Sequence, residues 1–296
     1  MPSPDEQGVI TRRLLVLQQI AFFSELAPSV LVSLAERARE VSVSRGQIAP
    51  PPSPGAIRFF PDGTLRRGAA GARGFAVLAP DLVPWLASAR FDGVVRARSD
   101  GLALEVPAAD LSAALEDEFS LYLAVASATA REIIETRTRA TPASAPEAFS
   151  RAFERDSRPL TMIDRVLFLR DTLPFARAHI GALVQLARDA TELRCGEGFE
   201  LWQEGSPADN ALFVLRGGVR AKIGGRDAFT LGPGTALGGL DVLGHHPRWF
   251  TATAAGPLLA LVLPVERFID VLEDRHELAR DVLRALARML LSTWSE

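Results

Sequence analysis

The stretch LGPGTALGGLDVLGHHPRWFTAT, residues 231–253, decides the fold of this chain. It opens with a turn signal, because Gly232 and Gly234 can adopt backbone angles that are denied to other residues. It then runs from Gly238 through a short apolar segment and a polar loop to Arg248. Such a run can bring exposed backbone N–H groups and one guanidinium to a single point, which is the chemistry that a bound phosphate needs. The stretch therefore predicts a phosphate-binding loop.

This stretch resembles the phosphate-binding cassette of the cyclic nucleotide-binding domain family, the jelly-roll module of catabolite activator protein-like and protein kinase A regulatory subunit-like proteins. The family pattern is roughly Gly-Glu-Leu-Ala-Leu-Leu, a short variable segment, and then Pro-Arg-Ala-Ala-Thr. The residues that fall on family positions are Gly238, Leu240, Val242, Leu243, Pro247, Arg248 and Thr251. The resemblance implies that the backbone of residues 238–240 and the guanidinium of Arg248 would hold a phosphate.

The departures from the family pattern affect the ligand rather than the fold. Gly239 stands where the family has the glutamate that holds the ribose 2′-hydroxyl, and Asp241 puts a negative charge where the family has alanine. Trp249 and Phe250 replace two small residues that let the phosphate approach. We therefore expect a vestigial or weak cassette, whose candidate ligand-binding residues are Gly238, Gly239, Leu240, Arg248, Trp249, Phe250 and Thr251.

Two of these features each leave two interpretations open. Arg248 can bind a phosphate in a bidentate way, or it can be an inherited arginine that now pairs with a local carboxylate such as Asp241. Trp249 and Phe250 can stack on a purine, or they can fill an ancestral pocket from the protein's own side. For the two aromatic residues the filling interpretation is favoured.

The composition is that of a folded protein with no special partner class. The 296 residues are 48% hydrophobic and 23% charged, and the net charge of −3 does not indicate a nucleic-acid or anionic-membrane surface. Cys195 is the single cysteine, which excludes an intrachain disulfide and a multi-cysteine zinc site. The polar, acidic start is not typical of a secretory signal, and no apolar run reaches the length of a membrane span. We expect a cytoplasmic protein.

The second half of the sequence repeats the first. RLLVL at residues 13–17 aligns with RVLFL at residues 165–169, and on the same shift Phe23 meets Phe175 and Glu40 meets Glu192. Near the far end of each half the shift is five residues longer. There the residues that align are Pro107 with Pro264, residues 115–117 with residues 272–274, and residues 130–131 with residues 287–288. This register predicts a tandem duplication.

The duplication predicts the domain organisation. We expect a degenerate domain over residues 1–135, a Pro- and Ala-rich linker over residues 136–147, and a second domain with a C-terminal helix over residues 148–296. Short strand candidates with Gly and Pro punctuation, including residues 74–78, are typical of a sandwich. The expected fold class is mainly β with flanking helices (α+β), as two tandem cyclic-nucleotide-binding-like jelly rolls.

The two copies differ in the cassette. The first copy reads DLVPWLASARFDG over residues 81–93, without Gly-Glu or Pro-Arg and about four residues shorter than the second copy. We expect no phosphate site in the first copy. The second copy carries EGSPAD at residues 204–209, which looks like a family turn, and is the better match.

No enzyme or metal site is predicted. The sequence lacks a nucleophile elbow, a Walker A motif and a zinc-protease motif, and its four histidines have no known ligand pattern around them. The last helix carries an apolar seam that we expect to contact its own domain, the first copy, a protein partner or a second chain: Val282, Leu286, Met289 and Leu290. The family's DNA-binding domain is not expected after this helix.

The predicted function follows from these features. We expect a non-catalytic regulatory or scaffold protein of bacterial signalling type, which acts through protein contacts and has largely or wholly lost cyclic nucleotide binding. It needs no cofactor. The alternative is a sensor whose second domain alone binds a cyclic mono- or dinucleotide.

Overall fold

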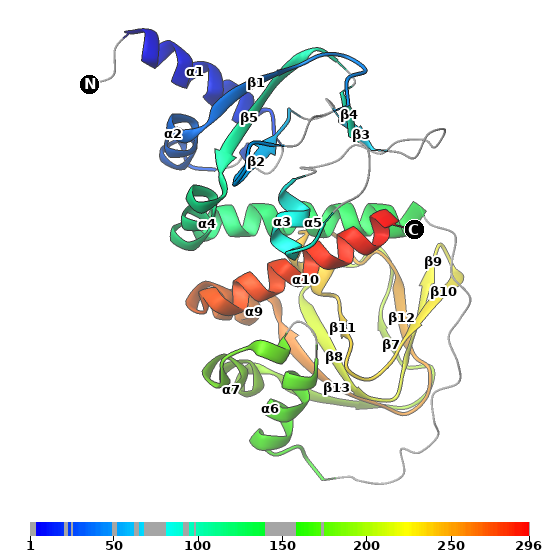
Figure 1. The fold of residues 1–296 in the computed structure, drawn as a ribbon. Helices are drawn as coiled ribbons and strands as arrows, with labels where there is room; N and C mark the ends of the chain where they lie inside the picture. Colours follow the sequence, from blue (N-terminus) through cyan, green and yellow to red (C-terminus); the bar gives the residue numbers. More distant parts are fainter. Residues whose placement is uncertain are drawn as a thin grey trace. The chain divides into compact units, whose positions relative to one another are not determined.

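The structure is a computed structural model that describes residues 4–20, 23–24, 26–48, 52–61, 65–67, 81–90, 95–97, 99–139, 158–172 and 175–295 (Figure 1). The chain forms two compact units. Unit 1 comprises Met1–Thr129 and Leu286–Glu296, and unit 2 comprises Ala130–Ala285. Sheet cores with flanking helices confirm the predicted class of β sheets with flanking helices.

Unit 2 contains two four-stranded antiparallel sheets, with strand orders β10-β9-β12-β7 and β11-β8-β13-β6. The strands are β6 (Thr191–Cys195), β7 (Glu200–Trp202), β8 (Asn210–Arg216), β9 (Val219–Ile223), β10 (Arg226–Leu231), β11 (Ala236–Leu237), β12 (Thr251–Ala254) and β13 (Leu258–Pro264). β8 and β13 lie side by side at the centre of their sheet, where Leu212 pairs with Val262. Their nearly continuous apolar sequences explain this central position, because both faces of such strands are covered.

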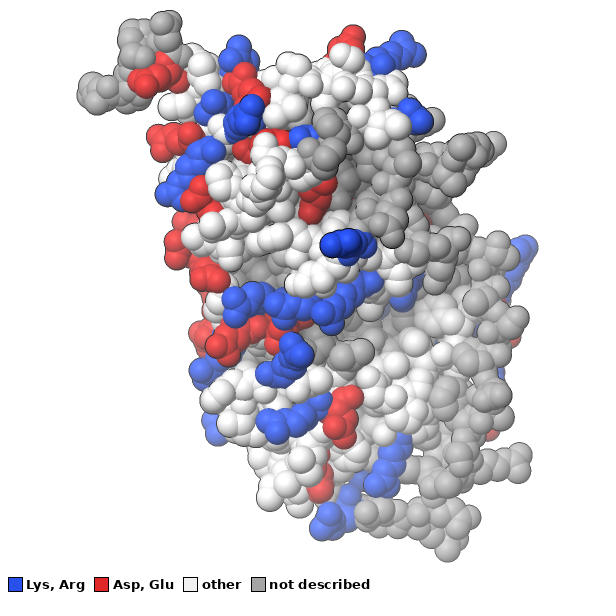
Figure 2. Space-filling view, in the orientation of Figure 1, with Lys and Arg blue, Asp and Glu red and all other residues white. Residues whose placement is uncertain are grey.

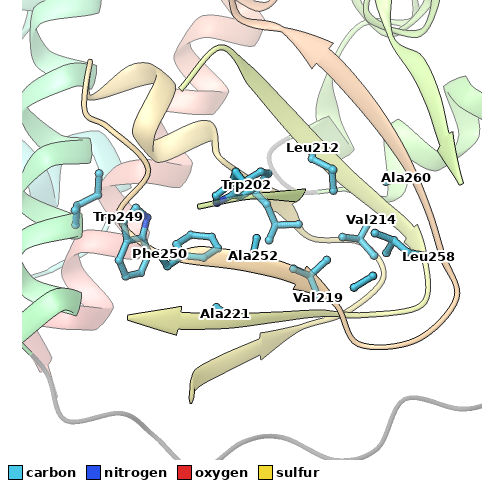
Figure 3. Packing of buried hydrophobic residues seen from close by; sticks show 13 residues of the cluster. Trp202, Leu212, Val214, Val219, Ala221, Trp249, Phe250, Ala252, Leu258 and Ala260 are labelled. Atoms are coloured by element: carbon cyan, nitrogen blue, oxygen red, sulfur yellow. The ribbon is translucent and has the colours of Figure 1, made fainter. Parts of the chain in front are cut away.

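The core of unit 2 lies between these sheets (Figure 3). Its members come from both sheets and from the cassette, and they include Trp202, Leu212, Val214, Leu237, Trp249, Phe250, Ala252 and Leu258. One further member, Ile134, comes from a helix that precedes the domain in the sequence. A cluster of this kind is the main source of stability for a sandwich.

Helices flank the sheets of unit 2: α6 (Met162–Asp171), a 3₁₀ turn at Phe175–Arg177, α7 (Ile180–Asp189), the short α8 (Gly239–Leu243) and α9 (Val265–Asp274). Thr161 begins α6 with a capping box, in which its side chain accepts from the N–H of Asp164 and the Asp164 side chain accepts from the N–H of Thr161. α7 buries Leu183 and Leu186, the face that the spacing of its apolar residues predicts.

Unit 1 contains a three-stranded sheet of order β1-β5-β2 and a two-stranded sheet of β3 and β4. Its elements are α1 (Pro4–Gln18), α2 (Pro28–Arg37), β1 (Arg39–Val43), β2 (Ala56–Phe59), β3 (Leu65–Arg67), α3 (Leu82–Ala87), β4 (Val95–Ala97), β5 (Gly101–Pro107) and α4 (Ala108–Asp117). The strand predicted over residues 74–78 lies outside the described residues.

A buried ion pair lies in the three-stranded sheet of unit 1. Arg58 on β2 lies directly across from Glu105 on β5, and both side chains are buried. Burial alone would raise the pKa of Glu105, but hydrogen bonds from Ser53 and Arg58 hold it below its ordinary value. Each charge therefore depends on its partner, since an unpaired charge in this position would be strongly unfavourable.

Two long helices are each divided between the units. α5 (Phe119–Arg139) begins in unit 1, and its residues from Ala130 onward belong to unit 2. α10 (His276–Ser295) begins in unit 2, and its residues from Leu286 onward belong to unit 1. The linker predicted over residues 136–147 therefore starts inside a helix, because α5 extends to Arg139, and the rest of that segment lies outside the described residues.

The apolar seam of α10 is an interior face. Val282, Leu286 and Leu290 are buried within the chain, and Met289 is half-buried. A protein partner or second chain that used this seam would have to displace residues of the chain itself.

The surface carries mixed charge. Basic and acidic side chains are interspersed over the face seen in Figure 2, as the small net charge leads one to expect. None of the described helices combines the length and the apolarity that crossing a membrane requires.

Candidate functional site

The cassette of unit 2 runs from β11 through α8 to β12. Gly238 follows β11 and is the N-cap of α8, with a φ of 74° in the left-handed region that favours glycine. A Cβ atom at this position would collide with Nη1 of Arg248 and would lie 3.0 Å from the carbonyl oxygen of Asn210. Gly238 is therefore required both for the turn and for the close approach of the arginine.

Arg248 is held by groups of the protein itself, although it is the candidate phosphate ligand, and these include an ion pair of its Nη2 with Oδ1 of Asp209 at 3.6 Å. The residue is only 2% exposed. Its Nη2 donates to the backbone oxygen of Asn210 at 2.8 Å and to Oδ1 of the same residue at 3.1 Å. Its Nη1 lies 3.4 Å from Oδ2 of Asp241, and its Cζ lies 4.1 Å from the centre of the Trp202 ring. The guanidinium is thus both paired and stacked by its own chain.

Asp241 is the internal counter-ion of Arg248. It lies in α8 and is completely buried. Burial raises the pKa of Asp241 to about 6, against the lowering effect of the Arg248 charge. Burial also lowers the pKa of Arg248, which Asp241 opposes. A phosphate that approached Arg248 would meet a carboxylate already in contact with that cation, so an incoming anion would be repelled.

Two buried polar atoms of this pair have no hydrogen-bond partner among the described residues: Oδ1 of Asp241 and Nε of Arg248. The Nε1 atom of Trp202, on whose ring the guanidinium stacks, is also unpartnered. Most buried polar groups in proteins are satisfied, so this cluster retains unused hydrogen-bonding capacity.

Trp249 and Phe250 lie in the protein core and not on an open pocket wall. They are 6% and 3% exposed. Their rings are 4.9 Å apart and nearly perpendicular, and Phe250 also contacts Trp202 at 5.6 Å (Figure 3). Phe229 on β10 contacts both rings. The two residues therefore fill space between the sheets, which is the arrangement that the filling interpretation predicts.

Comparison with known proteins bears on the fold of unit 2. Residues 193–275 match the family model of the cyclic nucleotide-binding domain. Unit 2 has the fold of a cyclic nucleotide-binding domain. A curated relative, a CRP-like cAMP-activated global transcriptional regulator of Mycobacterium tuberculosis, is 27% identical over 124 residues, which are 40% of this chain. The chain thus spans about half, 55%, of the length of the curated relatives it matches.

Solved structures show the same kind of likeness. The regulatory domain of Toxoplasma gondii PKA with cAMP is similar over 95% of this chain and 97% of its own, at 14% identity and a TM-score of 0.37. The N-terminal domain of a transcriptional regulator from Streptomyces coelicolor A3(2) covers 43% of this chain and 93% of its own, at 28% identity and a TM-score of 0.39.

The other candidate ligand-binding residues are not gathered around Arg248. A Cβ atom built on Gly239 has no other atom within 4 Å, so the position that would carry the family's glutamate faces open space. The hydroxyl of Thr251 accepts from the backbone N–H of Glu204 at 3.0 Å. Leu240 is half-buried and packs against the core cluster. Only Gly238 and Arg248 are brought together as a phosphate site would require.

Sequence reasoning missed several groups that shape the site. Asn210 and Trp202 hold Arg248 from β8 and β7, and the sequence offers only their nearness to the EGSPAD turn as a signal. Arg131 on α5 donates from Nε to the carbonyl oxygen of Gly244 at 2.6 Å, and Gly244 ends α8. Nothing in the sequence near residue 131 indicates a contact so far along the chain.

A metal centre has no support in the described parts of either unit. No group of three or more His, Cys, Asp or Glu side chains lies there in an arrangement that could hold an ion. The free thiol of Cys195 is partly buried, and burial raises its pKa, so it is a weak nucleophile.

Proposed function

We propose that this protein is a non-catalytic regulatory protein built from two cyclic-nucleotide-binding-like domains, in which the cassette of unit 2 no longer needs or admits a cyclic nucleotide. The observation that carries this proposal is the buried pair of Arg248 and Asp241. A carboxylate of the chain takes the electrostatic place that a ligand phosphate would have. The domain then acts through protein contacts, without a ligand.

Contacts at equivalent positions support two copies of one domain. Nη1 of Arg13 donates to the oxygen of Ala35 at 3.2 Å, and Nη1 of Arg165 donates to the oxygen of Ala187 at 3.2 Å, each residue 152 positions further on. The aromatic pairs agree as well. Phe23 and Phe59 meet edge-to-face at 5.1 Å, and Phe175 and Phe213 do so at 5.3 Å.

The cassette retains too few of the protein groups that would bind a cyclic nucleotide tightly. Gly239 supplies no carboxylate for a ribose hydroxyl, and a lost hydrogen bond to a charged group weakens binding by about 1.5–3 kcal/mol. Trp249 and Phe250 fill the space between the sheets beside the cassette. The like charge of Asp241 adds a further penalty for any phosphate.

Calorimetric titration of the full chain with cyclic AMP and with cyclic GMP tests the proposal. We expect a Kd weaker than about 100 μM for both, which corresponds to about −5.5 kcal/mol. Binding at low micromolar concentration or tighter that is abolished in Arg248→Ala would overturn it. Arg267→Ala is the matched control, because Arg267 is exposed on α9 and pairs with Asp270 of its own helix.

A sensor of cyclic mono- or dinucleotides is the second candidate. It is favoured by the preserved left-handed turn at Gly238 and by the open space around Gly239. In that case a ligand would have to separate Asp241 from Arg248. The titration with Arg248→Ala distinguishes the two candidates. A sensor binds the cyclic nucleotide and loses this binding in the variant, whereas a protein without a working cassette shows no binding in either form.

A further inference from the structure

Two arginines at equivalent positions of the repeat make the same hydrogen bond. In the alignment of the two halves, residues 130–131 fall on residues 287–288, so that Arg131 on α5 corresponds to Arg288 on α10. Nε of Arg131 donates to the carbonyl oxygen of Gly244 at 2.6 Å, inside unit 2. Nε of Arg288 donates to the carbonyl oxygen of Ala87 at 3.2 Å, inside unit 1.

The two acceptors are also equivalent. Gly244 is the C-cap of α8, the helix of the second cassette, and Ala87 is the last residue of α3, in the shortened cassette region of the first copy. The last carbonyl groups of a helix lack partners within the helix and carry partial negative charge. A hydrogen bond from a charged guanidinium N–H to such a carbonyl group is stronger than one between two neutral groups.

The approach of α5 to the second cassette is close and partly apolar. A Cβ atom at Gly244 would lie 3.4 Å from Cγ of Arg131 and 3.6 Å from Cβ of Ala130, so this glycine permits the contact. One turn further along α5, Ile134 is 2% exposed and belongs to the core cluster of Trp249 and Phe250. The second half of α5 is therefore part of the covering of the cassette in unit 2.

Each of these two hydrogen bonds joins the helix that follows one copy to the cassette region of the other copy. The helix that follows the strands of the first copy ends against the cassette helix of the second, within unit 2. The helix that follows the strands of the second copy ends against the corresponding helix of the first, within unit 1.

We propose that Arg131 and Arg288 form a reciprocal latch that couples the two cassette regions. Each arginine fixes the C-terminal end of the cassette helix encoded by the other copy, and each is carried on one of the helices that the two units share. A change in the position of α8 would be felt by α5, and one of α3 by α10. This inference rests on the two-copy architecture proposed above.

Hydrogen exchange of the full chain, followed by mass spectrometry, tests the latch. The variants are Arg131→Met and Arg288→Met, which keep most of the side-chain volume and remove the donor. We expect Arg131→Met to speed exchange about tenfold or more in residues 239–248, as loss of a charge-assisted hydrogen bond predicts. Because of the coupling, exchange in residues 82–90 should also become faster. Arg288→Met should affect the same two segments.

Arg284→Met is the matched control, since Arg284 on α10 forms an ion pair with Asp281 of its own helix. It should change neither segment. The double variant should be little different from the stronger single variant, because residues that act as one device are not additive.

Faster exchange that stays in the contacted segment of each variant would overturn the latch and leave two independent helix caps. Unchanged exchange in both variants would overturn it as well. If a methionine variant does not fold, Arg131→Lys and Arg288→Lys keep the positive charge with fewer fixed donors and should give a smaller effect in both segments. Cyclic nucleotide titrations do not enter these readouts, so a failed latch and a failed functional proposal are distinguishable.

Discussion

Asp241 lies in α8 with its carboxylate against the guanidinium of Arg248, and neither side chain reaches solvent. A buried ion pair gains little stability over a well-packed apolar pair, because desolvation offsets the attraction. Removing one partner is different, since it leaves an uncompensated buried charge. The pair is therefore better explained by what it does to the cassette than by a contribution to stability.

The pH dependence of stability gives a test of the Asp241 environment. Burial raises the pKa of Asp241 from 3.8 to about 6 in the folded protein. Since the folded protein then takes up the proton first, Asp241 contributes stability at acid pH that is lost as the pH rises through about 6. Between pH 4 and pH 7 this change amounts to roughly 2 kcal/mol in the free energy of unfolding.

Urea unfolding of the wild type and of Asp241→Asn across this pH range measures the effect. The other carboxylates are common to both proteins, so the difference between the two free energies isolates Asp241. We expect this difference to shift in favour of the wild type as the pH falls from 7 to 4. A difference that does not depend on pH would show that Asp241 has an ordinary pKa.

Restoring the ligand groups should restore binding. Trp249 and Phe250 are core residues, and truncating both would remove about 6–10 kcal/mol, as much as the whole stability of many domains. The variant Gly239→Glu with Asp241→Ala keeps both aromatic residues, and Gly239 faces open space. Removing Asp241 leaves Arg248 without this counter-ion, so the variant should lose about 3–5 kcal/mol of stability until a phosphate takes that place. We expect it to bind cyclic nucleotide about tenfold to a hundredfold more tightly than the wild type.

Gly239→Ala with Asp241→Ala is the control for this experiment, since it lacks only the carboxylate for the ribose. Calorimetry should find at most one ligand per chain, because the first copy has neither the Gly-Glu nor the Pro-Arg of a cassette. Two ligands per chain, or equal binding by the alanine control, would contradict the prediction.

At the scale of elements, the cassette and the sheets of unit 2 share one core. Phe250 precedes β12 and is buried against Trp202, Phe229 and Trp249. Phe250→Ala should therefore lower the free energy of unfolding by about 3–5 kcal/mol. Phe199→Ala, at a residue that is 48% exposed, should change it by less than about 0.5 kcal/mol. Chemical denaturation of both variants measures this, and equal losses would contradict the core assignment.

The sequence predicts most of the cassette of unit 2, but few of the residues that surround it. The glycines at 232, 234 and 238, the apolar 242–243 pair and Pro247-Arg248 define the turn, the short helix and the loop, because each depends on local backbone geometry. Asp241 is foreseen as a partner of Arg248 because the two are close in the chain. Trp202 and Asn210 are not, since only the pairing of distant strands brings them to the guanidinium.

The end of α5 is a second feature that the local sequence does not predict. The predicted first domain ends at residue 135, whereas α5 continues to Arg139 into the Thr- and Arg-rich segment. That segment has no apolar period, and Ile134 with Arg131 supplies the tertiary contacts that hold the helix there. Tertiary packing thus overrides the local composition at this boundary.

At the scale of the whole molecule, the two compact units do not follow the order of the sequence. Unit 2 takes the end of α5, and unit 1 takes the end of α10. Neither unit is therefore a continuous segment that could be cut out between residues 136 and 147 without removing a helix end from the other. Experiments on this protein are best made on the full chain.

The apolar seam of α10 gives the last test. An exposed seam would be expected to hold two chains together, and a charge at Leu286 would then separate them. In the structure Leu286 is 6% exposed and Leu290 is fully buried, so the seam is covered by the chain itself. We therefore expect Leu286→Asp to lower the free energy of unfolding by several kcal/mol, because it buries an unpaired charge, and to leave the molar mass unchanged.

Light scattering and urea unfolding of the same samples measure the two quantities. Ser292→Asp is the control, since Ser292 is exposed on the same helix and its hydroxyl donates to the carbonyl oxygen of Met289 one turn earlier. The control should keep both its mass and its stability. A wild type with twice the mass of the chain, which Leu286→Asp converts to a monomer of normal stability, would show instead that the seam is an interface between chains and that its burial here does not describe the assembled protein.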